Sequence, residues 1–205
     1  MVAVTKGFGV ATVRAALAAG LSTFGENRVQ EAVPKVEAAP GAEWHLVGHL
    51  QSNKVRPAVQ LFGTIHSVDS LELLDRIERI AHDDGRHPQI LLQVNTGGGA
   101  ERAGFALDGF AAEVDAPSGQ LIRALVGLRH ANPIGLMVMA SLEAPAAGQF
   151  ATLRQLSQRL RQASGLELPE LSMGMTADAE EAVRQGATLL RLGTGLFGPR
   201  PDHHR

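Results

Sequence analysis

Residues 170–195 read ELSMGMTADAEEAVRQGATLLRLGTG, and this stretch indicates the fold of the chain. A short apolar run leads into a turn with Gly174, then into a polar segment of helical composition, and then into a second apolar run that ends in glycines. A strand, a helix and another strand in succession are typical of a unit whose two strands pair in parallel. We therefore expect a parallel sheet in this part of the chain.

The same alternation extends over the rest of the sequence. Segments of helical period separate the apolar runs, as where Leu71, Leu74, Ile77 and Ile80 recur at helical spacing. The predicted strands are residues 2–6, 22–27, 43–48, 64–68, 89–95, 134–140, 170–174 and 188–195. Eight nearly continuous apolar strands predict an α/β protein with one closed (β/α)8 barrel of the TIM type, formed by residues 1–205 as a single domain.

Two features depart from a regular barrel. Residues 115–133 contain Pro117, Gly119 and Pro133, which predict a broken helix or an inserted loop between the fifth and sixth strands. The pattern also provides only seven crossover segments for eight strands. We therefore expect one outer position of the barrel to lack its helix.

Composition and charge restrict the classes of function. A formal net charge of -2 leaves no electrostatic footprint for nucleic acid or anionic lipid. The chain has no Cys, and the histidines of 82–87 and 202–205 lack a metal-ligand spacing, so we assign no metal. The N-terminus lacks the pattern of a signal peptide, and no apolar run approaches the ~20 residues of a membrane span. We expect a cytoplasmic monomer with neither nucleic acid nor membrane as a partner.

Lys6 ends the first predicted strand, at the barrel rim where functional groups gather. At the seventh strand, Thr176 or Asp178 begins a helix whose first backbone N–H groups can hold an anion. At the eighth strand, two glycines flank Thr194 and allow the backbone to approach a ligand closely. Together these turns resemble the phosphate cup that commonly follows strands seven and eight of such barrels.

Each of these features also has a purely structural explanation. Lys6 fits a solvated loop charge, Thr176 and Asp178 fit helix caps, and glycines after strands usually make turns. Arg191 stands within an apolar strand, where a buried guanidinium needs an anionic or hydrogen-bonding partner. Their shared location at one rim favours a ligand.

A lysine amine, a phosphate cup and an interior cation suit pyridoxal 5'-phosphate (PLP), held through its aldehyde as a Schiff base on Lys6. The attacking amine must be neutral, which partial burial near other cations favours. A barrel that binds another phosphorylated metabolite is the alternative, and Lys6 would then act only electrostatically. Absorbance distinguishes the two, because only a Schiff base gives a visible band.

Eight blocks of the sequence resemble, in order and over nearly the whole chain, the YggS/PROSC family of pyridoxal phosphate homeostasis proteins. They are VAVTK, FGENRVQE, EWHLVGHLQSNK, HSVD, LLQVNTGGGAERAGF, GLMVMA, LSMGMTAD and RLGTGLFG. The resemblance implies an alanine racemase-like barrel (PLP fold type III) that acts in intracellular PLP homeostasis by storage, delivery or regulation. It also implies PLP-dependent apoenzymes as possible partners.

The matching positions carry the roles of the family's site residues onto this chain. The resemblance assigns the covalent anchor to Lys6 and the contact with the pyridine nitrogen to Arg191. It assigns phosphate binding to Ser172, Gly174, Met175, Thr176, Gly193 and Thr194. Three further residues lie in matching blocks and are expected to line the site without a defined role: Asn27, His66 and Met137.

Other positions either depart from the family pattern or have a structural alternative. The family normally has a long helix before the first strand, and without it we expect weakened stability or a partner that covers the seam between strands eight and one. Arg102 stands where a lysine is common. Trp44 fits a core position, and Asn53 and Lys54 are expected to begin a helix rather than contact a ligand.

The sequence also distinguishes a binding protein from an enzyme. Alanine racemases use a tyrosine as second base and carry a second domain, whereas this chain has no Tyr and only a few residues follow the last predicted strand. Arg191 keeps its proton and would leave the pyridine nitrogen unprotonated, which disfavours carbanion chemistry. We therefore expect PLP binding without turnover, with a PLP-dependent amino-acid racemase-like enzyme as the alternative.

Overall fold

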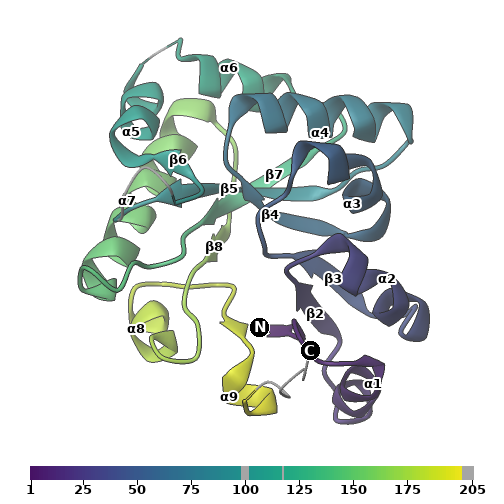
Figure 1. Cartoon of the computed structure of the whole chain (residues 1–205). Helices are drawn as coiled ribbons and strands as arrows, with labels where there is room; N and C mark the ends of the chain where they lie inside the picture. Colours follow the sequence, from purple (N-terminus) through teal and green to yellow (C-terminus); the bar gives the residue numbers. More distant parts are fainter. Residues whose placement is uncertain (98–101, 117, 200–205) are drawn as a thin grey trace.

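A computed structural model describes residues 1–97, 102–116 and 118–199, and it forms a barrel of parallel strands (Figure 1). All eight predicted strands are present. They are β1 (Val2–Val4), β2 (Thr23–Glu26), β3 (Glu43–Leu46), β4 (Thr64–Val68), β5 (Gln89–Asn95), β7 (Asn132–Met137), β8 (Glu170–Ser172) and β9 (Arg191–Leu192). Each pairs in parallel with its neighbour, in the order β8-β7-β5-β4-β3-β2-β1-β9.

The ring closes between β8 and the residues that lead into β9. Ser172 forms a parallel bridge with Leu189, the Met173 N–H donates to the Leu189 carbonyl at 3.2 Å, and the Arg191 N–H donates to the Gly174 carbonyl at 3.0 Å. Strands β1 and β9 also pair with each other. The turns after β8 and β9 therefore lie beside the end of β1, although they are far from it in the sequence.

Helices cover the outside of the barrel (Figure 1). They are α1 (Val10–Ala18), α2 (Val29–Ala38), the 3-10 turn η1 (Ser52–Lys54), α3 (Val55–Leu61), α4 (Leu71–Asp83), α5 (Leu107–Asp115), α6 (Gln120–Gly127), α7 (Ala146–Ser164), α8 (Ala179–Arg184) and α9 (Thr194–Phe197). In α4 the periodic Leu74, Ile77 and Ile80 are buried, as predicted. η1 continues into α3, which confirms that Asn53 and Lys54 begin a helix.

The broken crossover predicted within 115–133 is also present. Two helices, α5 and α6, replace a single one, and Gly119 is the residue that precedes α6. Pro117 lies outside the described residues, as do the histidines of 202–205. The pattern missed one element, β6 (Phe105–Ala106), which pairs in parallel with the end of β5 and is too short for a two-residue period to reveal it.

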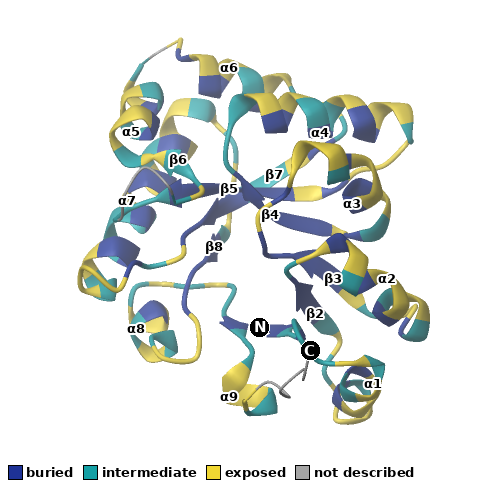
Figure 2. Cartoon of the chain, in the orientation of Figure 1, coloured by how far each residue is buried: buried dark blue, intermediate teal, exposed yellow. Residues whose placement is uncertain are grey.

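The strands have two faces with different contents. Their outer faces pack against the helices, and Trp44 stacks on Phe24 there with ring centroids 5.2 Å apart, so Trp44 is a core residue. Figure 2 shows the strands buried, while the outer faces of the helices are exposed. The inner faces carry polar residues that are almost completely shielded from solvent, among them His45, His66 and Arg191.

Candidate functional site

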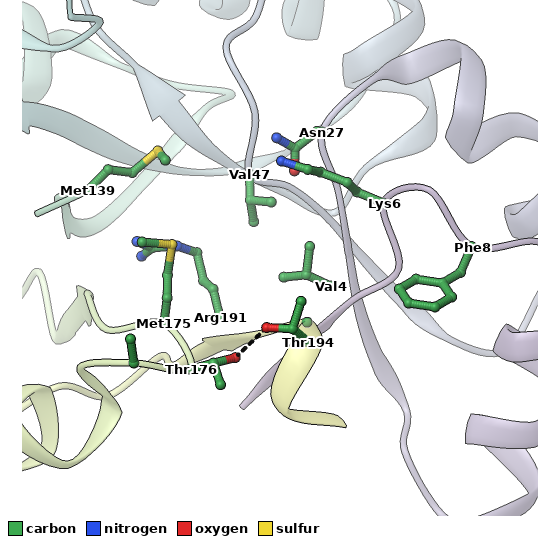
Figure 3. A pocket seen from close by; sticks show the side chains of 12 residues that line it. Val4, Lys6, Phe8, Asn27, Val47, Met139, Met175, Thr176, Arg191 and Thr194 are labelled. Atoms are coloured by element: carbon green, nitrogen blue, oxygen red, sulfur yellow. Dashed lines mark hydrogen bonds between the residues drawn. The ribbon is translucent and has the colours of Figure 1, made fainter. Parts of the chain in front are cut away.

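A cavity of about 310 Å³ opens at the carboxyl ends of the barrel strands (Figure 3). Seven of the predicted site residues line it. They are Lys6, Asn27, Met175, Thr176, Arg191, Gly193 and Thr194. The remaining lining residues are Val4, Phe8, Val47, Met139 and Ala177. The cavity is thus mostly apolar, with two cations and a few hydroxyl and amide groups.

Lys6 reaches the cavity because strand alternation directs it there. Val4 lines the cavity, the Thr5 hydroxyl donates to the buried Glu26 instead, and Lys6 again points into the cavity (Figure 3). Just beyond it, Gly7 has a φ of +78°, a conformation that glycine adopts without steric cost, and the chain turns away. The Lys6 amine lies beside the Asn27 side chain in Figure 3.

A buried ion pair behind Lys6 was not found by sequence analysis. Lys35 of α2 contacts the Glu26 carboxylate and donates to the Thr5 carbonyl at 2.8 Å, and the Thr5 hydroxyl donates to Glu26 at 2.6 Å. Burial raises the pKa of Glu26, and the contact with Lys35 opposes this shift. The cluster joins α2 to the backbone directly before Lys6. The sequence did contain a signal for the burial of Lys35. This residue follows Ala32 by three positions, and both lie on the buried face of α2.

The turns after β8 and β9 are held together by one hydroxyl group. Thr176 Oγ1 accepts from the Gly195 N–H at 3.0 Å and from the Thr194 hydroxyl at 3.4 Å (Figure 3). A Cβ on Gly195 would lie 2.9 Å from the Thr176 methyl group, so the close approach requires glycine there. The two turns therefore form one wall of the cavity.

The acidic residues near α8 each have a hydrogen-bond or ion-pair partner within the chain. Asp178 does not cap α8 through its side chain but accepts from the Met175 N–H at 2.6 Å. Glu180 and Glu181 both accept hydrogen bonds from Arg184 within α8. None of the three carboxylates is among the residues that line the cavity.

Arg191 extends from β9 into the cavity while its side chain stays almost fully buried. Its guanidinium donates to Ser172 Oγ at 2.7 Å and to the Val138 carbonyl at 2.8 Å. Burial lowers the pKa of Arg191 to about 10, and the charge of Asp178 opposes this shift. The group stays protonated at neutral pH, yet no carboxylate of the described chain lies within ion-pair distance of it.

Four predicted site residues do not line the cavity. His66, Met137 and Ser172 lie deeper in the barrel interior and are completely buried. Met139 takes the lining position instead of Met137, because it is two residues closer to the carboxyl end and the cavity lies beyond the strand. Gly174, with a φ of +91°, faces Ala182 and Leu190, so its lack of a side chain permits close packing of the turn.

Two further features surround the site. Arg102 donates to the carbonyls of Gly97 and Met139 at 3.3 and 3.4 Å. A separate cavity between the turns after β2 and β3 shares only Asn27 with the first and is lined in part by Lys54. Over the described ranges, no cluster of His, Asp and Glu could hold a metal ion and no helix could cross a membrane.

The buried histidines predict that stability falls in mild acid. Burial lowers the pKa of His45 and, more strongly, that of His66, with the nearby charge of Arg191 adding to the shift of His66. Below pH ~6.5 the unfolded chain binds protons that the folded chain does not, so the free energy of unfolding decreases by about 1–3 kcal/mol between pH 7.5 and 5.5. The raised pKa of Glu26 acts in the opposite direction, at the acidic end of this range.

Urea unfolding of the wild type and of His66→Gln at both pH values measures this dependence. The variant should lose less stability on acidification, because one of the two shifted groups is gone. Equal losses in both proteins would contradict the assignment to His66.

Comparisons with known proteins agree with this architecture. The family model described as the alanine racemase N-terminal domain matches residues 2–201. The pyridoxal phosphate homeostasis protein of Synechocystis sp. is 41% identical, over 98% of this chain and 91% of its own length. That of Pseudomonas aeruginosa is 40% identical, over 98% of this chain and 84% of its own length.

Solved structures confirm the fold. PipY of Synechococcus elongatus with PLP bound has a TM-score of 0.86 at 43% identity and covers 97% of this chain and 92% of its own. Alanine racemase of Corynebacterium glutamicum has a TM-score of 0.75 at 18% identity, over 100% of this chain and 57% of its own. This second likeness concerns the fold alone: an α/β barrel of the alanine racemase type.

Proposed function

Since the chain belongs to the YggS/PROSC family of pyridoxal phosphate homeostasis proteins, we propose that it binds PLP covalently through the amine of Lys6. The observation that carries the proposal is the convergence, in one cavity, of Lys6 with Arg191 and the turn at Gly193 and Thr194. The proposed role is PLP homeostasis in the cytoplasm, by storage, delivery to apoenzymes or regulation.

The donor groups of the cavity fit PLP at both ends. The chain has three lysines, and Lys6 alone lines this cavity, because Lys35 is engaged in the buried ion pair and Lys54 lies in the neighbouring cavity. At the phosphate end, Thr176 and Thr194 supply hydroxyl groups. A volume of about 310 Å³ is within the usual range for small-molecule sites, about 300–1,000 Å³.

The glycine at position 193 allows the turn after β9 to approach the end of β1 closely. A Cβ there would lie 3.3 Å from the Val4 carbonyl oxygen, so a larger residue would crowd both β1 and the cavity wall. The neighbouring Thr194 and Thr176 are exposed to solvent. The wall therefore combines accessible hydroxyl groups with closely approaching backbone.

The residues of the site favour binding over turnover. When bound, PLP supplies an aldehyde that condenses with amines and a ring that withdraws electrons. Arg191 is protonated at neutral pH and can only donate hydrogen bonds, so a ring nitrogen that accepts from it carries no proton and withdraws electrons less strongly. The chain also has no tyrosine to act as a second base. These two properties support the proposal of a binding protein without turnover.

Absorbance spectroscopy of the purified wild-type protein tests the proposal. On addition of PLP we expect a visible band that borohydride reduction converts into a stable adduct, located by mass spectrometry on the peptide that contains Lys6. PLP binding without such an adduct would support the alternative of a simple phosphate site. Racemisation of alanine or serine at a kcat of about 1 to 10³ per second would refute the binding role and support a racemase-like enzyme.

A further inference from the structure

A line of hydrogen-bonded side chains crosses the barrel interior from the opposite rim to the cavity. Ser172 Oγ lies 2.7 Å from Arg191 Nη1 and 2.8 Å from His66 Nδ1. His66 Nε2 lies 2.8 Å from His45 Nδ1, and His45 Nε2 lies 3.1 Å from a carboxylate oxygen of Glu43. The last contact is within ion-pair distance but does not qualify as a hydrogen bond.

The burial of this line is unusual for the inside of a barrel. Such interiors are normally filled by branched apolar side chains, and unsatisfied polar groups there are costly. His66 and Ser172 are fully buried, while His45 and Arg191 are at most 5% exposed. Only Glu43, the first residue of β3 with a side chain 54% exposed, reaches solvent at the amino-terminal rim.

The chemistry of the end groups determines the direction of every hydrogen bond. Arginine has no acceptor, so Ser172 Oγ accepts from Arg191 and its own hydroxyl donates to His66 Nδ1. His66 therefore carries its proton on Nε2 and donates to His45 Nδ1. His45 in turn carries its proton on Nε2, which faces the Glu43 carboxylate.

The reverse direction is unfavourable at both ends. Ser172 would then accept two hydrogen bonds and leave its own buried hydroxyl without a partner. His45 would also present a nitrogen lone pair to the Glu43 carboxylate at 3.1 Å. Both conflicts disappear when each group donates away from Arg191.

We infer that Ser172, His66 and His45 form a polarised relay, through which Glu43 acts as the remote counter-charge of Arg191. The hydroxyl and imidazole groups of the relay turn their acceptor atoms towards the guanidinium. Among the residues described, no carboxylate contacts this guanidinium directly. The relay positions Arg191 and leaves its remaining N–H groups available to the cavity. Its effect on the PLP ring rests on the proposed function, whereas the relay itself exists in the ligand-free protein.

Other charges act on the two ends and define the controls. The negative charge of Glu170 acts on His45 together with that of Glu43. The negative charge of Asp178 acts on Arg191. Glu37, an exposed residue of α2, contacts none of these groups. Glu37→Gln therefore makes the same change of charge as Glu43→Gln without touching the relay.

Nitrogen-15 NMR of the ligand-free wild type at pH 7 tests the direction of the relay. We expect both His45 and His66 to be neutral, with the proton on Nε2. A proton on Nδ1 of His66, or a charged imidazolium at either position, would overturn the inference. This measurement is independent of whether the protein binds PLP.

The PLP dissociation constant tests the coupling of the relay to the cavity. Glu43→Gln should weaken PLP binding about threefold to tenfold with an unchanged thermal midpoint, whereas Glu37→Gln should change neither quantity. Equal affinity in Glu43→Gln and wild type would overturn the role of Glu43 as counter-charge. Absence of PLP binding in the wild type would refute the proposed function, and the NMR result would still decide the relay.

Discussion

Lys6→Ala is expected to abolish the visible band that PLP produces and the adduct that borohydride fixes. Lys6 alone among the three lysines lines the cavity, so its loss leaves no amine that can reach the same position. The amine makes no hydrogen bond or ion pair within the described chain, so the free energy of unfolding should change little. Titration with PLP, followed by absorbance and mass spectrometry, measures the effect.

Lys54→Ala is the matched control. Lys54 lines the neighbouring cavity between the turns after β2 and β3, and the variant should keep the band and the adduct. A visible band of wild-type intensity in Lys6→Ala would show that another amine holds PLP. In that case the covalent assignment to Lys6 is wrong.

Lys35→Met is expected to lower the free energy of unfolding by about 3–5 kcal/mol, because it leaves the carboxylate of Glu26 buried without its counter-charge. The Glu26 side chain is completely buried, and one of its oxygens already lacks a hydrogen-bond partner. The substitution also removes the donor to the Thr5 carbonyl, directly before Lys6. Urea unfolding monitored by circular dichroism measures the loss.

The double variant Lys35→Met/Glu26→Gln separates the charge from the packing. Glutamine is neutral and has the shape of glutamate, so the double variant should recover much of the stability that Lys35→Met loses. If the single and double variants are equally unstable, the loss arises from packing around Lys35 rather than from an unpaired charge. That result would contradict the proposed cause.

Local pattern was sufficient for most of the fold. Apolar runs predicted all eight barrel strands, and the spacing of Leu74, Ile77 and Ile80 predicted the buried face of α4. These signals depend on neighbours within one or two turns, so the sequence contains them directly. The apolar pattern did not predict β6, because its two residues form a strand only through pairing with β5.

The candidate site was less completely predictable. Seven of the eleven predicted residues line the cavity, but Met139 replaces Met137 as the lining methionine. That choice depends on how far β7 extends relative to the cavity, which follows from the stagger of the strands and not from the order of residues. Lys35 was missed for a similar reason, because a charged residue on a helix is usually solvated and only its packing against β1 and β2 buries it.

The sequence by itself determined the parallel barrel, the family and the positions of Lys6 and the glycine turns, because each depends on short-range pattern or on direct resemblance. Only the tertiary structure decided that Ser172 and His66 lie beneath the cavity, joined to Glu43 at the far rim rather than exposed to a ligand. The physical reason is closure of the barrel. Contacts across its interior join residues more than 100 positions apart, and the tilt and stagger of all eight strands together determine which side chains meet.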